Sequence, residues 1–472
     1  MEKQFAVKAK ELFGEACIDK SLYMRSGLFG RSIPTFVAEW LIDRYCLGGE
    51  LTPEAQSKIN AFVEDHLPTK DQKEPIKHRL ANGEVLTILD HFSVTVDLRQ
   101  NLRKLRIPCI DETGFIEIRL LDEYPMLLGG GIWGAGKLVY RPPDLESGNP
   151  WGEIWMSEFR PMQVASLDLD FFCEQRQHFT LDEWRELLVN SIGYNPAAYT
   201  PEQQHLLLTR LVPIVQPRVN MVELAPKGTG KSFVYSNLSR YVRMISGGRV
   251  TAAVLFYNLA SNQPGLLTQY DLVVFDEAQT ISFDDPGQVV GVLKDYLESG
   301  RYTRGRQQAT ADAGVILLGN IPIDSDGRPR EPILFRNLPH FIQETAFIDR
   351  MHGLVAGWDL PRITVNSPAR GVGFKADFFS EVLHRLRDRG GFVEFFNHHA
   401  QIRGTDDMRD KKAIERLAAA YLKLLFPDLK VSAEEFLRYC AQPAVALRQR
   451  VREQLAKMDP EYRVVRITVD VS

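Results

Sequence analysis

The segment APKGTGKS, Ala225–Ser232, has the residue types and spacing that hold a polyphosphate. Gly228 and Gly230 allow a tight turn in which several backbone N–H groups point at phosphate oxygens. A helix predicted to begin near Lys231 adds the positive end of its dipole. Lys231 would reach the β- and γ-phosphates, and the Ser232 hydroxyl would bind Mg²⁺. The remaining members of the predicted nucleotide-binding loop are Ala225, which stands where the usual pattern has glycine, Pro226, Lys227 and Thr229.

Polar side chains also end two apolar strands that follow this loop in the sequence. LVVFDE ends in Asp276, which would hold Mg²⁺ directly or through water, and Glu277, which would orient and polarise the attacking water. VILLGN ends in Asn320, a pattern that resembles the sensor-1 element of AAA+ ATPases, whose amide contacts the γ-phosphate or the water. Together these residues predict hydrolysis of ATP with Mg²⁺.

Arginines further along the chain predict a shared site. Arg350 in FIDRMHG looks like the arginine finger of AAA+ proteins, which comes from the neighbouring subunit. Such a residue adds positive charge at the transferring phosphoryl group and is worth ~10³–10⁵ in rate. Arg350 therefore predicts an oligomer. A lid arginine usually senses the nucleotide in these proteins; Arg409 is the candidate, while Arg362 and Arg403 remain open.

Two basic segments are candidate DNA contacts. ESGRYTRGRQQATADAG would form a hairpin that faces the pore of a ring, and its arginines and aromatic ring suit phosphates and bases. VDLRQNLRKLRIP would place a basic patch on a β domain. The candidates are Arg301, Tyr302, Arg304, Arg306, Arg99, Arg103, Lys104 and Arg106. Two alternatives stay open. The hairpin would then be a solvated or interface loop, and the second segment would be a solvated face.

A second match to the loop pattern, GIWGAGK at Gly131–Lys137, lacks the hydroxyl because Leu138 follows it. No helix opens after it, and its neighbours alternate like a strand. We predict a glycine-rich strand or bulge there.

The elements that must carry these residues predict an α/β fold. It consists of an AAA+ P-loop parallel sheet core with a helical lid, preceded by a small helical domain and a β-barrel-like domain. The expected boundaries are 1–84 for the N-terminal helical domain, 85–164 for the β-barrel-like, DNA-binding domain, 165–200 for a helical connector, 201–363 for the ATPase core, and 364–472 for the lid and tail.

The bulk properties exclude several classes of protein. With 472 residues and a formal charge of −4, the chain has no uniformly basic surface, so DNA binding must use local patches. Its five cysteines are scattered singly, which argues against a zinc site or a disulfide framework. No apolar run reaches ~18 residues, and the charged start does not suit a signal peptide. We expect a cytoplasmic protein without membrane contact.

The segments APKGTGKSFVYSNLSRY, DLVVFDEAQ, YLESGRYTRG, GVILLGN and FIDRMHG, in this order, resemble the Lon-related BREX-system family BrxL. The resemblance covers roughly residues 203–425. It implies an AAA+ ATPase of bacterial anti-phage defence that forms multimeric, DNA-binding rings with a core similar to MCM helicases. The expected assembly is a homo-oligomeric hexamer, with stacked rings left open and other defence-system proteins as further candidate partners.

The end of the chain departs from longer family members, which carry a Lon-like protease domain after the lid. Little more than a strand-like tail follows Asp459, so protease activity is not expected. Whether the chain is a short form or a truncation stays open. Two other functions also remain: a protein-remodelling unfoldase without its own protease, and an ATP-dependent DNA clamp that does not translocate.

Overall fold

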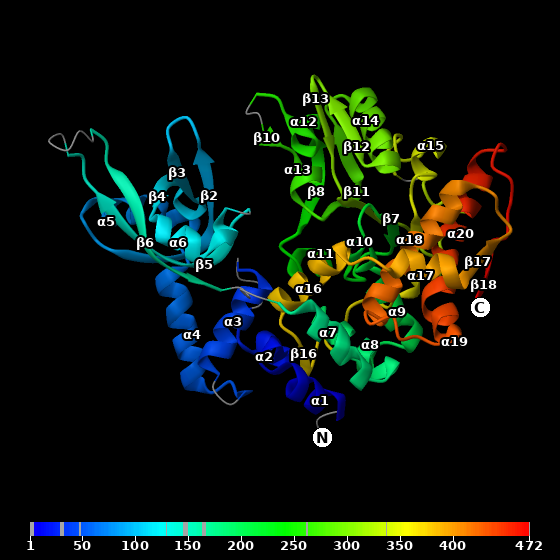
Figure 1. Cartoon of the computed structure of the whole chain (residues 1–472), viewed down its shortest axis with the longest axis horizontal. Coiled ribbons are helices and arrows are strands. Elements are labelled where there is room, and N and C mark those ends of the chain that lie inside the picture. The colour runs from blue at the N-terminus through cyan, green and yellow to red at the C-terminus, as the bar shows by residue number, and fades with distance from the viewer. Residues whose placement is uncertain are drawn as a thin grey trace. The chain divides into compact units, whose positions relative to one another are not determined.

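The computed structural model describes residues 4–28, 33–46, 49–128, 130–144, 150–162, 167–260, 263–336 and 338–471. Two compact units make up the chain (Figure 1): residues 1–20 with 166–472, and residues 21–165. The start of the chain joins the larger unit because α1 (Gln4–Phe13) ends in Phe13, whose ring contacts Trp184 and Phe374. The predicted region 1–84 thus contributes to both units.

A closed five-stranded barrel forms the centre of the smaller unit, as the alternating pattern predicted. Its strands follow the order β2 (Leu86–Asp97), β3 (Leu102–Ile107), β4 (Glu112–Ile116), β6 (Glu153–Pro161) and β5 (Ile132–Arg141). The helices of this unit include α3 (Thr35–Tyr45), α4 (Pro53–His66), α5 (Lys73–Ala81) and α6 (Ile118–Glu123). The second glycine-rich match lies in β5. A Cβ at Gly136 would come within 2.6 Å of Met156 Cε, so glycine there serves packing of the barrel.

A parallel five-stranded sheet forms the centre of the larger unit and confirms the predicted α/β arrangement. Its order is β15 (Gly353–Ala356), β7 (Asn220–Ala225), β14 (Gly314–Asn320), β11 (Leu272–Phe283) and β8 (Val242–Val250). The three central strands contain the apolar runs MVEL, LVVF and VILLGN, each of which predicts a strand, while the two edge strands were not predicted. Because all neighbours pair in parallel, the strands' carboxyl ends meet at one edge of the sheet.

Helices cover this sheet and extend beyond it. They include α8 (Leu181–Ser191), α9 (Pro201–Thr209), α11 (Lys231–Asn237), α14 (Pro286–Ser299), α15 (Thr345–Ile348), α16 (Ala376–Asp388), α17 (Phe392–His399), α18 (Met408–Leu425) and α20 (Gln442–Met458). The last strand, β18 (Thr468–Val471), pairs with β17 (Ala400–Arg403) beside the orange and red helices of Figure 1. In the described ranges, no helix is both long and apolar enough to cross a bilayer.

Candidate nucleotide site

The predicted phosphate loop connects β7 to α11. Gly228 and Gly230 have φ angles of 83° and 74°, in the left-handed region that favours glycine. A Cβ at Gly230 would lie 2.6 Å from the Tyr194 hydroxyl oxygen, whereas one at Gly228 would meet nothing within 4 Å. The loop therefore packs tightly at its base and remains open around Gly228, where a phosphate would lie.

A buried ion pair beneath the loop fixes its shape. Arg210 Nη2 and Glu223 Oε1 lie 2.6 Å apart, and both side chains are fully buried. The same guanidinium donates to the carbonyl oxygens of Thr229 and Gly230 at 3.3 and 3.4 Å. Burial lowers the pKa of Arg210, but Glu223 outweighs that effect and the net pKa is raised. The loop is thus held by a permanent charge before any ligand binds.

Lys231 and the two strand ends come together at the carboxyl edge of the sheet. Lys231 Nζ donates to Asn320 Oδ1 at 2.8 Å and to the Pro226 carbonyl at 3.2 Å. Burial lowers the pKa of Lys231, an effect that the nearby carboxylates of Glu223 and Asp276 oppose. The structure therefore brings the predicted lysine, acid and amide into one site.

Glu277 has an unusual backbone for a residue with a side chain. Its φ is 48°, and its N–H donates to Asp276 Oδ1 at 2.9 Å. Left-handed conformations are uncommon outside glycine, and strained residues cluster at functional sites. Glu277 is exposed and Asp276 and Ser232 are half-buried, so the groups that the sequence assigned to water and metal are accessible.

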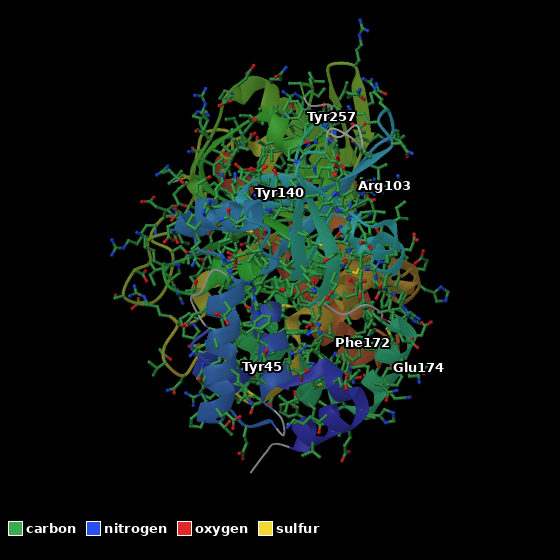
Figure 2. All side chains as sticks on the ribbon, turned by 90° about the vertical axis from the view of Figure 1, so that its left-hand side faces the viewer. Tyr45, Arg103, Tyr140, Phe172, Glu174 and Tyr257 are labelled. Carbon is green, nitrogen blue, oxygen red and sulfur yellow. The ribbon has the colours of Figure 1, made fainter. Side chains whose placement is uncertain are left out.

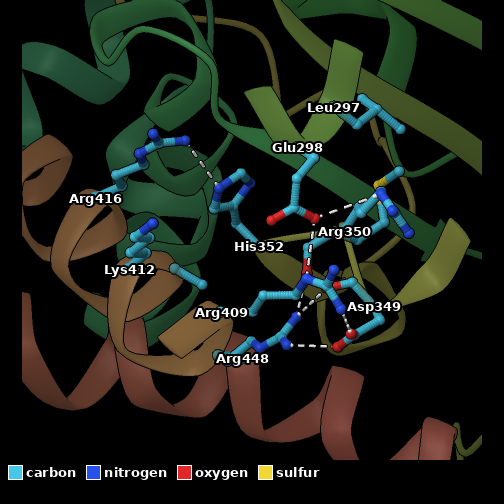
Figure 3. A pocket seen from close by; sticks show the side chains of 11 residues that line it. Leu297, Glu298, Asp349, Arg350, His352, Arg409, Lys412, Arg416 and Arg448 are labelled. Atoms are coloured by element: carbon cyan, nitrogen blue, oxygen red, sulfur yellow. Dashed lines mark hydrogen bonds and ion pairs between the residues drawn. The ribbon is translucent and has the colours of Figure 1, made fainter. Parts of the chain in front are cut away.

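The predicted arginines Arg350 and Arg409 lie at the opposite, amino edge of the sheet. They line a cavity of about 60 Å³ together with Glu298 and His352 (Figure 3). Arg350 lies three residues before Gly353, the first residue of β15, which pairs with Met221 at the start of β7. The six residues of β7 span about 20 Å, so neither arginine reaches the phosphate loop of its own chain.

Acidic side chains hold the two arginines in this cavity. Glu298 Oε2 lies 2.9 Å from Arg409 Nε and 3.5 Å from Arg350 Nε, as the dashed lines of Figure 3 show. Asp349 binds Arg409 at 2.7 Å and the buried Arg448 at 2.9 Å. Arg409 is therefore anchored twice, while Arg350 depends on a long contact with Glu298 and on the Ala346 carbonyl.

Two donors in this cavity lack a suitable acceptor. Arg350 Nε is buried without a hydrogen-bond partner. His352 Nδ1 accepts from the Asn220 N–H at 2.9 Å, so the neutral ring carries its proton on Nε2. That nitrogen faces Arg416 Nη1 at 3.3 Å, which places two donors against each other. Burial and the Arg416 charge hold the pKa of His352 well below its usual value, so the ring stays neutral.

The other two candidates for the lid arginine have different surroundings. Arg362 is exposed beside Ile363, whose N–H donates to the Gly228 carbonyl at 2.8 Å. Arg403 lies on β17 and is paired with Asp470 of β18. Of the three, Arg362 is the arginine whose backbone adjoins the phosphate loop of the same chain.

The predicted hairpin forms, but its tyrosine points inward. β12 (Arg301–Arg304) and β13 (Gln307–Thr310) pair directly after α14. Tyr302 is 3% exposed, and its hydroxyl donates to the Phe256 carbonyl at 2.7 Å. Tyr302 therefore anchors the hairpin in the core and is removed from the predicted DNA contacts. Arg301 and Arg306 are exposed, whereas Arg304 donates to the carbonyl of Tyr257, labelled in Figure 2.

The basic segment of the smaller unit lies on the β2–β3 hairpin, where Figure 2 labels Arg103. Arg99 and Arg106 are exposed, and Lys104 is paired with Asp97 at 3.0 Å. In register next to Lys104 lies Phe115, and next to Phe115 lies Trp155.

The aromatic neighbours of this segment were missed from the sequence. The rings of Phe115 and Trp155 stack at 5.4 Å, and Arg141 lies 4.2 Å over Trp155. Strand alternation alone could have indicated that these side chains share the outer face of the barrel.

Comparison with known proteins covers nearly the whole chain. The family model described as the ATPase domain of Lon-like protease BrxL-like proteins matches residues 154–468, and the BREX system Lon protease-like protein BrxL N-terminal model matches residues 11–140.

Two curated relatives named Lon-like protease BrxL are similar over the same range. The protein from Escherichia coli O9:H4 (strain HS) is 29% identical over 432 residues, which cover 91% of this chain and 61% of that protein. The protein from Bacillus cereus (strain H3081.97) is 30% identical over 436 residues, which cover 91% of this chain and 63% of that protein. This chain thus spans somewhat over three fifths of either relative and, by its N-terminal and ATPase regions, belongs to the BrxL family of Lon-like BREX-system proteins.

Proposed function

We propose that this chain is an AAA+ ATPase that assembles into a ring, hydrolyses ATP at sites shared by neighbouring copies and grips DNA in anti-phage defence. Its family carries a BrxL-type ATPase domain. The hydrogen bond from Lys231 to Asn320 supports the ATP-binding half, because it joins two motifs 89 residues apart at the phosphate loop.

At this half, each residue has a role that follows from its position. The loop N–H groups and Lys231 bind the β- and γ-phosphates. Without nucleotide, Asn320 accepts the hydrogen bond from Lys231, and a phosphate oxygen takes its place when ATP binds. Ser232 and Asp276 have the oxygen ligands that Mg²⁺ prefers, and the ion would neutralise charge between the two phosphates. Glu277 orients the attacking water. Arg362, beside Gly228, is the arginine best situated to contact nucleotide within one chain.

The observation that carries the ring is the distance between the two halves of the site. The finger arginine Arg350 and its neighbour Arg409 lie about 20 Å from the loop of their own chain, across the length of β7. A phosphoryl group can meet both halves only when the amino edge of one copy faces the carboxyl edge of the next. Such a head-to-tail contact closes into a ring, for which we expect six copies.

Two surfaces support DNA as the ligand of the ring. The β12–β13 hairpin exposes Arg301 and Arg306 and buries its aromatic ring, which suits a polyanion better than the apolar grip expected of an unfoldase. The barrel adds Lys104 beside the stacked Phe115 and Trp155, a combination of charge and ring faces that is typical of nucleic-acid surfaces.

A mixing experiment tests the shared site. Arg350→Ala and Glu277→Gln chains should each be nearly inactive alone. After mixing, an Arg350→Ala chain next to a Glu277→Gln chain regains a complete site, so about a quarter of the interfaces should hydrolyse ATP in a randomly mixed ring. ATPase activity that stays at the level of the separate variants would refute the composite site.

A strand-displacement assay with tailed duplex DNA separates a translocase from the clamp. A clamp would bind DNA with ATP without displacing a strand. Electron microscopy of the same sample would give the number of copies per ring and the occupancy of its channel.

A further inference from the structure

Glu298 lies between the arginines of the amino-edge cavity and the β12–β13 hairpin. It belongs to the last turn of α14, and its carboxylate contacts both Arg350 and Arg409 in the amino-edge cavity (Figure 3). No other carboxylate among the described residues is paired with both arginines. Glu298 is about 42% exposed, so a larger or more highly charged anion could displace it without unfolding the cavity.

The contact with the finger arginine is incomplete. Glu298 Oε2 lies 3.5 Å from Arg350 Nε, and that nitrogen forms no hydrogen bond. A phosphoryl oxygen carries more negative charge than a carboxylate oxygen and would bind a guanidinium more strongly. Glu298 is therefore a weaker partner for Arg350 than a phosphoryl oxygen would be.

The chain leads from Glu298 directly into the DNA-gripping hairpin. Only Ser299 and Gly300 separate Glu298 from Arg301, the first residue of β12. Gly300 closes the helix with φ 74°, and Arg218 donates to the Ser299 carbonyl at 2.9 Å. Because this spacer is short and has a defined conformation, a displacement of the hairpin base would also displace Glu298.

We propose that Glu298 is a positioning residue that couples ATP hydrolysis to the hairpin. It retains Arg350 while the hairpin is free and releases it to the neighbouring copy's phosphates when the hairpin binds its ligand, whereas Arg409 stays bound to Asp349. This inference rests on the proposed function, since it needs both the shared site and a DNA-responsive hairpin. It adds a residue that neither the nucleotide motifs nor the arginine finger include.

Glu298→Gln tests this role because it removes the charge and keeps the shape. The full chain should show a DNA-free ATPase rate raised about two- to fivefold, the range that loss of one exposed ion pair allows. The rate at saturating duplex DNA should be unchanged, so the stimulation by DNA should fall by the same factor. Glu298→Asp, which restores the charge, should return most of the stimulation.

Glu344→Gln is the matched control. Lys294 and Glu344 form a second ion pair between α14 and the segment around α15, at 2.7 Å and one helical turn from Glu298. Its loss would loosen the same two elements without freeing either arginine. Stimulation by DNA should therefore stay at the wild-type level in Glu344→Gln.

The outcomes separate the coupling from the proposed function. If Glu298→Gln keeps the wild-type DNA-free rate, or loses activity with and without DNA, Glu298 is not a competitor and the coupling is wrong while the ATPase ring stands. An equal effect of Glu344→Gln would reduce Glu298 to a structural ion pair. A wild-type chain that hydrolyses no ATP, or that ignores DNA, would overturn the proposed function and the coupling together.

Discussion

The two edges of the parallel sheet differ in how completely their polar groups are paired. At the carboxyl edge, Arg210 is matched by Glu223, and Lys231 by Asn320. At the amino edge, Arg350 Nε has no hydrogen-bond partner and His352 Nε2 faces another donor. Buried donors without acceptors destabilise a fold, so they persist where a partner supplies the acceptor. The charged groups beneath the loop are thus paired within the chain, although the Tyr235 hydroxyl of α11 is buried without a partner, whereas Arg350 and His352 each keep a donor without an acceptor.

The largest effect is expected from a substitution at the amino edge alone. Arg350→Ala should lower ATP hydrolysis by ~10³–10⁵ while leaving nucleotide affinity within a few-fold, because the loop belongs to the other edge. Steady-state ATPase rates and binding of a fluorescent ATP analogue measure the two quantities. Lys231→Ala provides the contrast, since it should abolish both. An active Arg350→Ala chain would show that the finger has been assigned to the wrong residue.

The next largest effect is expected from removing the ion pair at the carboxyl edge. Arg210→Met should lower the free energy of unfolding by about 3–5 kcal/mol, because it leaves the buried Glu223 charge without a partner. Urea unfolding measures the loss. The double variant Arg210→Met/Glu223→Leu should recover most of this stability but bind ATP more weakly than wild type, since the carbonyls of the loop are no longer held. Wild-type stability of Arg210→Met would mean that the pair does not support the loop.

A third change tests whether the amino edge is continuous with a DNA surface. Replacing Arg301, Arg304 and Arg306 with serine should weaken duplex DNA binding. It should also make the slope of log K against log salt shallower by about 2 to 3, since each lost phosphate contact removes about 0.9. Fluorescence anisotropy over a salt series measures both. Serine at Gln307 and Gln308 is the neutral control on the same hairpin, and an unchanged slope in the arginine variant would locate the DNA elsewhere.

The smallest effect is expected in the pH dependence of stability, which tests the buried His352 of the amino edge. His352 has a depressed pKa in the folded chain, so below about pH 6.5 the unfolded chain binds the extra proton and stability falls as pH falls. The contribution is complete above pH 6.5 and is lost by at most about 1.4 kcal/mol per pH unit below it. His352→Gln should reduce the slope of the unfolding free energy against pH by up to about 1.4 kcal/mol per pH unit between pH 6.5 and 5. Parallel wild-type and variant curves would contradict a neutral, buried His352.

The nucleotide half could be predicted because its residues follow local rules. Strand, glycine turn and helix lie next to one another in the sequence, and the acids and the amide stand at the ends of apolar strands, so parallel pairing alone brings Asp276 and Asn320 to Lys231. The edge strands β8 and β15 escaped prediction for a related reason. β8 includes paired glycines and exposed polar residues, and β15 has only four residues, so neither has a clear apolar run.

The supporting charges could not be predicted from any pattern. Arg210 and Glu223 are 13 residues apart, and Glu298 meets arginines 52 and 111 positions later. Only the folded chain brings such pairs together. Tyr302 was misjudged because alternation along a short hairpin does not reveal which face meets the core. Phe13 likewise joins the larger unit through ring contacts that a sequence of isolated segments cannot indicate.

The glycine that ends α14 sets a limit on how the hairpin can vary. Gly300 has a left-handed backbone, and a Cβ there would lie 2.7 Å from Arg218 Cδ. Glycine is thus required at Gly300, between Glu298 and β12, whereas the turn at Gly305 lies at the exposed tip. Related chains would be free to insert or delete residues at the tip of the hairpin but not at Gly300. The same rule tells a protein engineer where a different recognition loop can be grafted without silencing the response to it.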